Sequence, residues 1–257
     1  MTEKILFTLQ QSGIAVITFN RPHVHNALDL EAMQAFADLI ERLGKDDSLR
    51  AVILTGEGEK AFCSGGDLAD LSERRSEADA FTMIGLMGDA LLALESLPVP
   101  VIAAINGYAL GGGSEIAITC DLRVIDENAR IGFVQAKRGL TPGWGGGQRL
   151  LRLVGYARAM EILLGARVLR PDEIRSLGLA NRLMPPGQAL AGALELARQF
   201  AQLDPNVIRS VKTLLRAGLR QPYEEALLTE RALFPPLWVG ETHTKSMDEF
   251  LNRQNRA

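Results

Sequence analysis

The chain has 257 residues and a formal net charge of −3, with 47% hydrophobic and 23% charged residues. This balance is that of a globular protein with a full core, and the negative charge gives no electrostatic reason to expect a nucleic-acid partner. Because there is no run of about 20 apolar residues and no signal-like or Arg-rich start, we expect no membrane partner and predict a cytoplasmic protein.

The first half of the chain alternates between strand-like and helix-like segments. Apolar and β-branched runs predict strands at residues 5–8 and 14–19, which form a hairpin, and at residues 52–54, 101–105, 122–125 and near Ile131. Helical spacing of apolar residues predicts helices at residues 29–43, 81–97 and 114–119, the first of them capped by Asp29. The polar stretch Ser72–Asp79 is expected to be a mobile surface segment. Such alternation predicts an α/β fold with parallel strands and crossover helices.

From about Gln188 onward the expected elements are helices only. They are residues 189–202, 205–217, 222–234 and 242–253. Two interpretations remain open for this part: a helical cap folded onto its own core, or a surface that packs against neighbouring subunits. Apolar residues such as Leu214, Leu228 and Trp238 fit either one.

Two turns between a strand and a helix carry the strongest functional signal. The first is Lys60–Leu68, KAFCSGGDL, and the second contains Gly111–Gly113 followed by Ser114 and Glu115. Glycine lets a backbone N–H approach a ligand closely, and the N-terminal end of a helix stabilises negative charge. Two such turns can each give one N–H to the same oxygen, which makes an oxyanion hole, and a carboxylic acid one turn further on is placed for proton transfer. The alternative for the second turn is a plain glycine-rich turn capped by Ser114.

Together these turns resemble the crotonase superfamily, also called the enoyl-CoA hydratase/isomerase family, and the likeness covers nearly the whole chain. Further segments that carry it are RPHVHNAL (residues 21–28), LRVIDENARIGF (122–133), LTPGWGGGQRL (140–150), YARAMEILLGARVL (156–169) and LGLANRLMP (177–185). The resemblance implies a spiral of ββα units in residues 1–200. It also implies an all-helical oligomerisation region in residues 201–257, which builds homotrimers that often pair into hexamers.

The resemblance also implies the site residues. Gly66 and Gly112 would be the oxyanion donors, facing the carbonyl of a coenzyme A thioester as it becomes an enolate. The residues expected to bind the acyl-CoA substrate are Asn26, Ala27, Leu28, Ser64, Asp67 and Leu68, with a helix cap as the alternative for Asp67. Coenzyme A enters as part of the substrate, so no separate cofactor is expected. The two cysteines and three histidines show no disulfide framework and no metal-ligand spacing, so no metal is expected either.

Hydratases of this family hold and activate one water with two glutamates. The first matches Glu115, but the position of the second is Gln135, which cannot take up a proton. This argues against two-carboxylate hydration, and also against the isomerases that depend on an acid at the second position. A structural role is the alternative for both residues, and burial in an apolar pocket would raise the pKa of Glu115.

One branch of the family fits this pattern better. The run GFVQAKRGLTPGWGGG from Gly132, with Trp144, and the tail Thr229–Gly240, with Trp238, resemble the ethylmalonyl-CoA and methylmalonyl-CoA decarboxylase-like crotonases. That branch lacks the second glutamate too, although it has histidine where this chain has Gln135. By this resemblance Trp144 lines the substrate pocket, and core packing is the alternative.

The chemistry of decarboxylation agrees with this pattern. Departing carbon dioxide leaves its electrons as the thioester enolate, so no base is needed. A fixed carboxylate about 4 Å from the substrate carboxylate would repel it by about 4 kcal/mol at an effective dielectric constant near 20. Neutral Gln135 avoids this repulsion and can donate a hydrogen bond. We therefore expect a lyase that decarboxylates a short alkylmalonyl-CoA. The alternatives are a hydratase, dehydratase or isomerase that uses Glu115 alone as general acid or base, and a non-catalytic acyl-CoA-binding scaffold.

Overall fold

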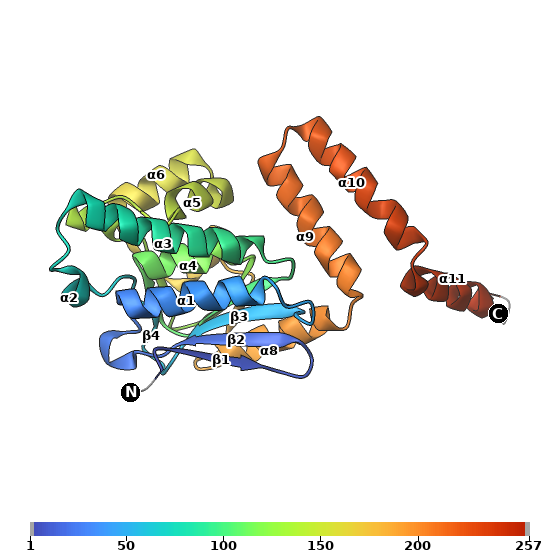
Figure 1. Ribbon diagram of the computed structural model, residues 1–257, viewed down its shortest axis with the longest axis horizontal. Coiled ribbons are helices and arrows are strands. Elements are labelled where there is room, and N and C mark those ends of the chain that lie inside the picture. Colours follow the sequence, from blue (N-terminus) through green and yellow to red (C-terminus); the bar gives the residue numbers. More distant parts are fainter. Residues whose placement is uncertain (1–2, 255–257) are drawn as a thin grey trace. The chain divides into compact units, whose positions relative to one another are not determined.

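The computed structural model describes residues 3–254, and the chain divides into two compact units, one up to Gln199 and one from Phe200 onward (Figure 1). The first unit contains both sheets and all of their crossover helices. The α/β fold with carboxyl-terminal helices that the sequence predicts is confirmed.

The larger sheet has six strands in the order β1-β2-β3-β5-β7-β10. Their bounds are β1 (Ile5–Leu9), β2 (Ile14–Phe19), β3 (Ala51–Gly56), β5 (Val101–Ile105), β7 (Leu122–Asp126) and β10 (Arg182–Met184). The pair β1–β2 is the predicted antiparallel hairpin, and all other neighbours in this sheet are parallel. Every residue of β3 and β5 is buried, as in a sheet that is covered on both faces.

A smaller sheet, which the sequence patterns do not predict, has the order β4-β6-β8-β9. Its strands are β4 (Ala61–Cys63), β6 (Tyr108–Leu110), β8 (Arg130–Gly132) and β9 (Val168–Leu169). Three times in succession, a strand of the large sheet leads into a strand of the small sheet and then into a helix. This repetition gives the spiral of ββα units. Strands of two or three residues are too short to show a period-2 pattern, which is why only the segment near Ile131 was predicted.

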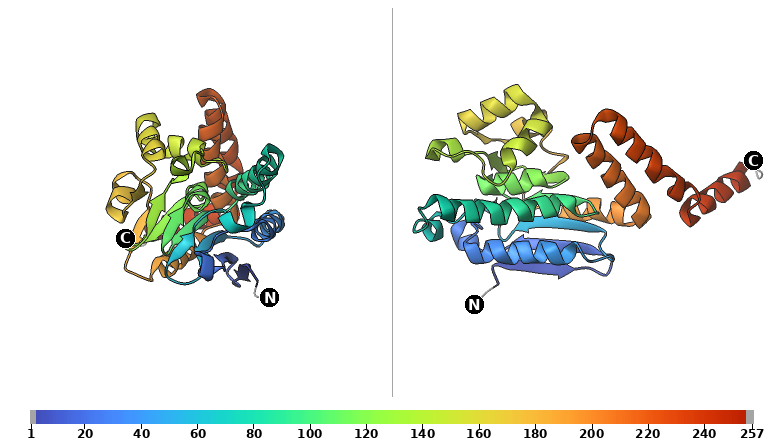
Figure 2. Two further views of the ribbon diagram at one scale, coloured as in Figure 1. Left: turned by 90° about the vertical axis from the view of Figure 1, so that its left-hand side faces the viewer. Right: turned by 45° about the horizontal axis from the view of Figure 1, so that its top comes forward.

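The first unit contains seven α-helices and two 3₁₀ turns within the described residues, and an eighth helix leads out of it. They are η1 (Pro22–Val24), α1 (Leu30–Leu43), α2 (Leu68–Leu71), α3 (Glu77–Ser96), α4 (Gly112–Thr119), η2 (Gln135–Arg138), α5 (Gly146–Val154), α6 (Tyr156–Gly165), α7 (Pro171–Ser176) and α8 (Ala189–Ala201). Helices α1 and α3 lie side by side (Figure 2). Asp29 caps α1 as predicted, because its carboxylate accepts a hydrogen bond from the Ala32 N–H.

The prediction for Ser72–Asp79 needs correction. Helix α3 begins at Glu77, inside the stretch that was expected to be a mobile surface segment. The Ser76 hydroxyl accepts a hydrogen bond from the Asp79 N–H, and the Asp79 carboxylate accepts one from the Ser76 N–H. This reciprocal capping box starts the helix one turn before Phe81, its first large apolar residue, where hydrophobic spacing cannot mark it.

The second unit contains α9 (Pro205–Arg220), α10 (Tyr223–Trp238) and α11 (Glu241–Gln254). Helices α9 and α10 form an antiparallel hairpin (Figures 1 and 2). The expected end of α10 at Phe234 is wrong, because the helix continues through Pro235 and Pro236. The φ angle of proline suits a helix, so one more turn can follow despite the missing N–H donors. None of the helices in residues 3–254 is both long and apolar enough to cross a membrane.

Candidate active site

The two glycine-rich turns meet in the first unit. A Cβ atom on Gly65 would lie 2.8 Å from the Gly112 nitrogen, and one on Gly113 would overlap the Cys63 carbonyl oxygen. Gly65 and Gly111 also have positive φ angles of 93° and 55°, which L side chains rarely adopt. Glycine is therefore required here both by close approach and by backbone conformation, and the turn after β4 is packed directly against the start of α4.

Each turn presents a backbone N–H without a partner in the protein. Within residues 3–254, neither the Gly66 N–H nor the Gly112 N–H donates a hydrogen bond to another group of the chain. Both residues are half-buried, so a ligand can reach them. Helix α4 begins at Gly112, two residues before the predicted start at Ser114, so the Gly112 N–H is one of the free donors at a helix N-terminus. These are the two groups that the sequence predicts as oxyanion donors.

Trp144 packs against the second turn. A Cβ atom on Gly112 would overlap the six-membered ring of Trp144, so the ring lies flush with the helix start. The Trp144 side chain is buried. It therefore belongs to the hydrophobic core and, at the same time, forms a wall next to a predicted oxyanion donor.

Four N–H groups hold the Glu115 carboxylate, and the residue is only 2% exposed. Oε2 accepts hydrogen bonds from the Trp144 and Gly146 N–H groups, both at 2.8 Å. Oε1 accepts one from Gln135 Nε2 at 2.9 Å and a longer one from the Gly143 N–H at 3.3 Å. All four donors suit the ionised form of the acid.

Two effects act on the pKa of Glu115 in opposite directions. Burial raises this pKa, and the four hydrogen bonds lower it, so that the net direction is upward. A raised pKa brings a glutamate closer to neutral pH, where taking up and returning a proton are both easy. Glu115 can therefore serve as a general base and as the conjugate acid.

Gln135 is oriented by Glu115. Because its Nε2 donates to the carboxylate, its Oε1 faces away, and this oxygen is buried without a hydrogen-bond partner in the described chain. The opposite orientation would set an amide oxygen against a carboxylate oxygen. A buried, unpaired carbonyl oxygen is rare in proteins and destabilises the fold by about 1–3 kcal/mol. A group that the protein alone does not supply is expected to pair with it.

A cavity of about 420 Å³ adjoins this residue. Its lining includes Gln135 together with the mostly apolar residues Phe133, Leu140, Pro142, Met160, Leu163 and Leu164. Gly145 and Gly147, at the start of α5, form another part of the wall, and they are chain neighbours of Trp144 and Gly146, whose N–H groups hold Glu115. A small ligand in this cavity would contact both Gln135 and the start of α5.

The segment Asn26–Leu28 lies beside the first turn but turns its side chains inward. The Asn26 side chain is fully buried, donates to the Glu57 and Ala61 carbonyls, and accepts from the Arg21 N–H. Ala27 and Leu28 are buried in the core as well. These positions leave no free side-chain group for a substrate, so the substrate contacts that the sequence predicts for this segment would have to come from its backbone.

The residues of the first turn differ in their exposure. Leu68 is 53% exposed and free to contact a ligand, while the Ser64 hydroxyl lies 3.4 Å from the Val24 carbonyl oxygen. Asp67 caps α2 by accepting from the Ala69 N–H, and its other oxygen accepts from Arg21. The alternative of a helix cap therefore describes the Asp67 carboxylate, and contact of Asp67 with substrate remains a prediction.

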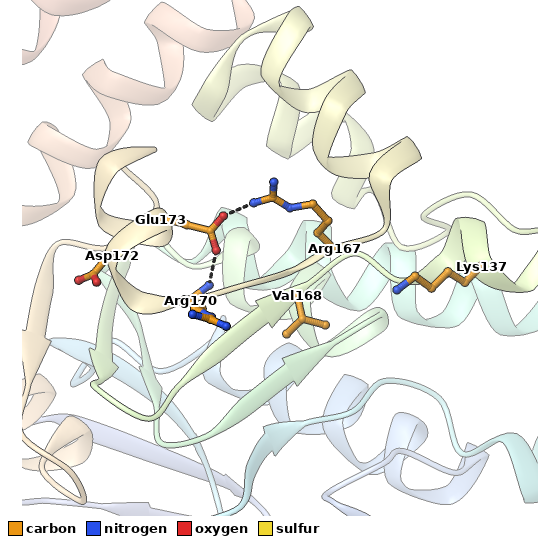
Figure 3. Close-up of a pocket in the computed structure, with 6 residues that line it drawn as sticks. All are labelled: Lys137, Arg167, Val168, Arg170, Asp172 and Glu173. Carbon is orange, nitrogen blue, oxygen red and sulfur yellow. Dashed lines mark hydrogen bonds and ion pairs between the residues drawn. The ribbon is translucent and has the colours of Figure 1, made fainter.

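A second hollow has a volume of about 710 Å³ (Figure 3). Its lining is mostly charged and comes from η2, β9, α7 and the residues next to β9: Lys137, Arg167, Val168, Arg170, Asp172 and Glu173. Figure 3 shows the ion pair of Arg167 with Glu173 on its wall. None of the site residues predicted from the sequence lines this hollow.

Comparison with known proteins agrees with this geometry. The sequence profile of enoyl-CoA hydratases/isomerases matches residues 9–256. The chain belongs to the enoyl-CoA hydratase/isomerase family. A short-chain-enoyl-CoA hydratase of Clostridium acetobutylicum is 36% identical over 96% of this chain and 94% of its own length. A crotonyl-CoA hydratase of Syntrophomonas wolfei is 32% identical, covering 95% and 94% of the two chains.

Solved structures of this family show the same fold. The crystal structure of an enoyl-CoA hydratase from Bacillus anthracis superposes with a TM-score of 0.92 at 30% identity, covering 98% of this chain and 97% of the other. The relatives named here are hydratases. They therefore do not support the expected resemblance to the decarboxylase-like branch of the family.

Several contacts in this candidate site have no signal in the sequence. The backbone donors of Gly143, Trp144 and Gly146 to Glu115 have no signal in residue type, because any residue except proline carries an N–H. Arg21, which donates a hydrogen bond to the Asp67 side chain, was not predicted either. Its only sequence signal was its place at the start of the segment RPHVHNAL.

Proposed function

We propose that this enzyme hydrates short enoyl-CoA thioesters and that Glu115 is the single carboxylate that acts on the water. The observation that carries the proposal is the Glu115 carboxylate, which is held as an ion by four N–H donors one helical turn after Gly112. The names of the relatives support the same reaction, since the two described above are hydratases of short-chain enoyl-CoA and of crotonyl-CoA.

The reaction can be written with this one acid. Glu115 takes a proton from water as the water oxygen bonds to C3 of the enoyl group. The electrons of the C2–C3 double bond move toward the thioester carbonyl, and the resulting enolate oxygen accepts hydrogen bonds from the Gly66 and Gly112 N–H groups. Glu115 then returns the proton to C2, which gives the 3-hydroxyacyl thioester. One carboxylate thus serves as base and then as acid.

Of the two carboxylate oxygens, Oε1 is the better candidate for the proton transfer. Oε2 is anchored by two backbone N–H groups at 2.8 Å, which cannot move without the loop. Oε1 is held by a side chain and by one long bond of 3.3 Å from Gly143. A water molecule can displace the weaker of these donors, so we assign the reacting position to Oε1.

Decarboxylation of an alkylmalonyl-CoA is the second candidate, and the geometry does not favour it. A substrate carboxylate beside an ionised Glu115 would be repelled by several kcal/mol at the distances of a closed site. One N–H of Gln135 is already donated to Glu115, and its free oxygen would repel a carboxylate. An isomerase that moves the double bond through Glu115 alone remains a variant of the same acid–base chemistry.

A panel of acyl-CoA thioesters, read by mass spectrometry, tests the proposal. Wild-type enzyme should add water to crotonyl-CoA and release no carbon dioxide from ethylmalonyl-CoA or methylmalonyl-CoA. Glu115→Gln should lower hydration by about 10²–10⁴-fold, the usual value of general acid–base catalysis. This variant should fold, because a rotated Gln135 can present its unpaired Oε1 to the new amide.

The opposite pattern would overturn the proposal. If wild type leaves crotonyl-CoA unchanged and decarboxylates an alkylmalonyl-CoA, the enzyme is the decarboxylase that the sequence suggested. Hydration that survives in Glu115→Gln would show that another group acts on the water.

A further inference from the structure

The turn that carries Gly66 is held in place by a neighbouring segment of the chain. Leu28 and Gly66 form an isolated parallel β-bridge. The Leu28 N–H donates to the Gly65 carbonyl and the Asp67 N–H donates to the Leu28 carbonyl, each at 2.8 Å. The peptide groups on both sides of Gly66 are thus fixed to Leu28, and the direction of the Gly66 N–H follows from that pairing.

The Arg21 guanidinium connects the two segments that form this bridge. Its Nη1 donates to the Asp67 carboxylate at 2.8 Å and to the Ala27 carbonyl at 2.6 Å, and its Nη2 lies 3.1 Å from the Asp29 carboxylate. Asp67 follows Gly66 in the chain, and Asp29 follows Leu28. One guanidinium therefore joins the two residues that come directly after the two bridged positions.

These charges are largely shielded from solvent. The side chains of Arg21, Asp29 and Asp67 are 13%, 9% and 12% exposed. Such ion pairs are screened less by water and salt than pairs at the surface. Burial raises the pKa of Asp29, but its bonds to Lys4 and the Ala32 N–H and the charge of Arg21 outweigh burial and hold the pKa below its usual range. Asp29 therefore carries its charge at neutral pH.

We propose that Arg21 is a positioning residue of the oxyanion hole, which directs the Gly66 N–H by joining Asp67 to Asp29 across the Leu28–Gly66 bridge. The inference rests on the proposed function, because it assigns Gly66 to the thioester oxygen. Arg21 itself need not touch the substrate. Its effect belongs to the transition state, where a misplacement of about 1 Å can lower a rate by about 10²-fold.

The fork of arginine suits this task and lysine does not. Three acceptors from two segments surround the guanidinium, and its planar group can donate to all of them from two nitrogens. A lysine ammonium is a single point with a flexible stem, so it would pair with one carboxylate and release the other. Arg21→Lys thus keeps the charge and removes the connection.

The test compares Arg21→Lys with wild type in hydration of crotonyl-CoA and in binding. We expect kcat to fall by about 10- to 100-fold with KM changed by less than about twofold, the pattern of an interaction made in the transition state. Free coenzyme A, which has no thioester carbonyl, should bind with unchanged affinity in calorimetry. In hydrogen exchange followed by mass spectrometry, the peptide around residues 64–68 should exchange faster, because the Asp67 N–H is held less firmly against the Leu28 carbonyl.

Lys4→Gln is the matched control. Lys4 also binds Asp29, at 2.7 Å, but does not reach Asp67, so its loss should change neither kcat nor exchange in the turn. Asp67→Asn, which removes one charge and keeps the shape, should lower kcat in the same direction as Arg21→Lys. The double variant should lose less than the product of the two single effects, because both break the same connection.

The outcomes separate this inference from the proposed function. If wild type does not turn over any thioester, the proposed function fails, and Arg21 then has no oxyanion to serve. If wild type is active and Arg21→Lys exchanges faster in the turn with an unchanged kcat, the proposed function stands and the inference is wrong. Equal losses in acyl-CoA and free coenzyme A affinity would also overturn it, since Arg21 would then act through binding of the coenzyme.

Discussion

Glu115 and Gln135 form the pair on which the chemistry depends. Glu115 must be ionised to take a proton from water, so hydration is lost as the pH falls through the pKa of Glu115. Burial raises this pKa from the ordinary value of 4.5. The acid limb of the kcat/KM profile should therefore lie above pH 4.5, and a pH series of crotonyl-CoA hydration measures it.

Gln135→Glu should move that limb to higher pH. A second carboxylate would lie at hydrogen-bond distance from Glu115, where Gln135 Nε2 is now 2.9 Å away, and like charges this close raise the pKa of one of the two acids. Gln148→Glu is the control, since it adds the same charge to the wall of the same cavity without a hydrogen bond to Glu115. Equal shifts in both variants would mean that the contact between residues 115 and 135 has no special effect on the titration.

At the scale of elements, the packing of α4 against β4 decides whether the two turns can meet. Gly113→Ala places a methyl group on the Cys63 carbonyl oxygen, a backbone atom that cannot rotate away. We expect destabilisation by about 1–3 kcal/mol, measured as a lower midpoint in thermal or urea unfolding. Gly88→Ala in α3 is the control, because its methyl group would meet no atom within 4 Å and should stabilise the helix by about 0.5–1 kcal/mol. Equal midpoints in the two variants would contradict the close packing.

The sequence predicts those elements that have a long period or a recognisable cap. The β1–β2 hairpin, the Asp29 cap of α1 and the four helices after Gln188 follow from pattern alone. The small sheet does not, because its strands have two or three residues and are held by neighbours that are distant in the chain. Helices α5 and α6 were not predicted, although their sequences carry part of the family resemblance.

The same limit applies to the site. The two glycine-rich turns and the acid that follows the second one have a sequence signature, and the family resemblance singles out Gly66, Gly112 and Glu115 within them. The orientation of Gln135 has no such signature, since it depends on a hydrogen bond across 20 positions of the chain. The sequence predicts that Gln135 donates a hydrogen bond to a substrate carboxylate. In the structure it donates to Glu115 instead, and this contact favours hydration over decarboxylation.

For the whole molecule, the second unit points to assembly. Helix α10 has no buried residue in the described chain, although it contains many large apolar side chains. The exposed large apolar side chains of the second unit include Leu215, Leu219, Leu228, Phe234, Trp238 and Val239. A helix with such a face needs another surface to cover it, and second copies of this chain are the partners that the family resemblance implies.

We therefore predict a homotrimer, or a hexamer of two trimers, in solution. Light scattering at micromolar concentration should give three or six times the mass of one chain, and a clean monomer would refute the prediction.

Leu215→Glu tests which surface forms the interface. It puts a charge on a side chain that is 62% exposed in the single chain, so the helix should stay folded, as circular dichroism can show. The mass of the assembly should fall toward that of the monomer. Thr213→Glu is the control on the same helix, because residues two positions apart point to different faces. If both variants keep the mass of the wild type, Leu215 lies outside the interface; if both lose it equally, the added charge and not the covered apolar face explains the dissociation.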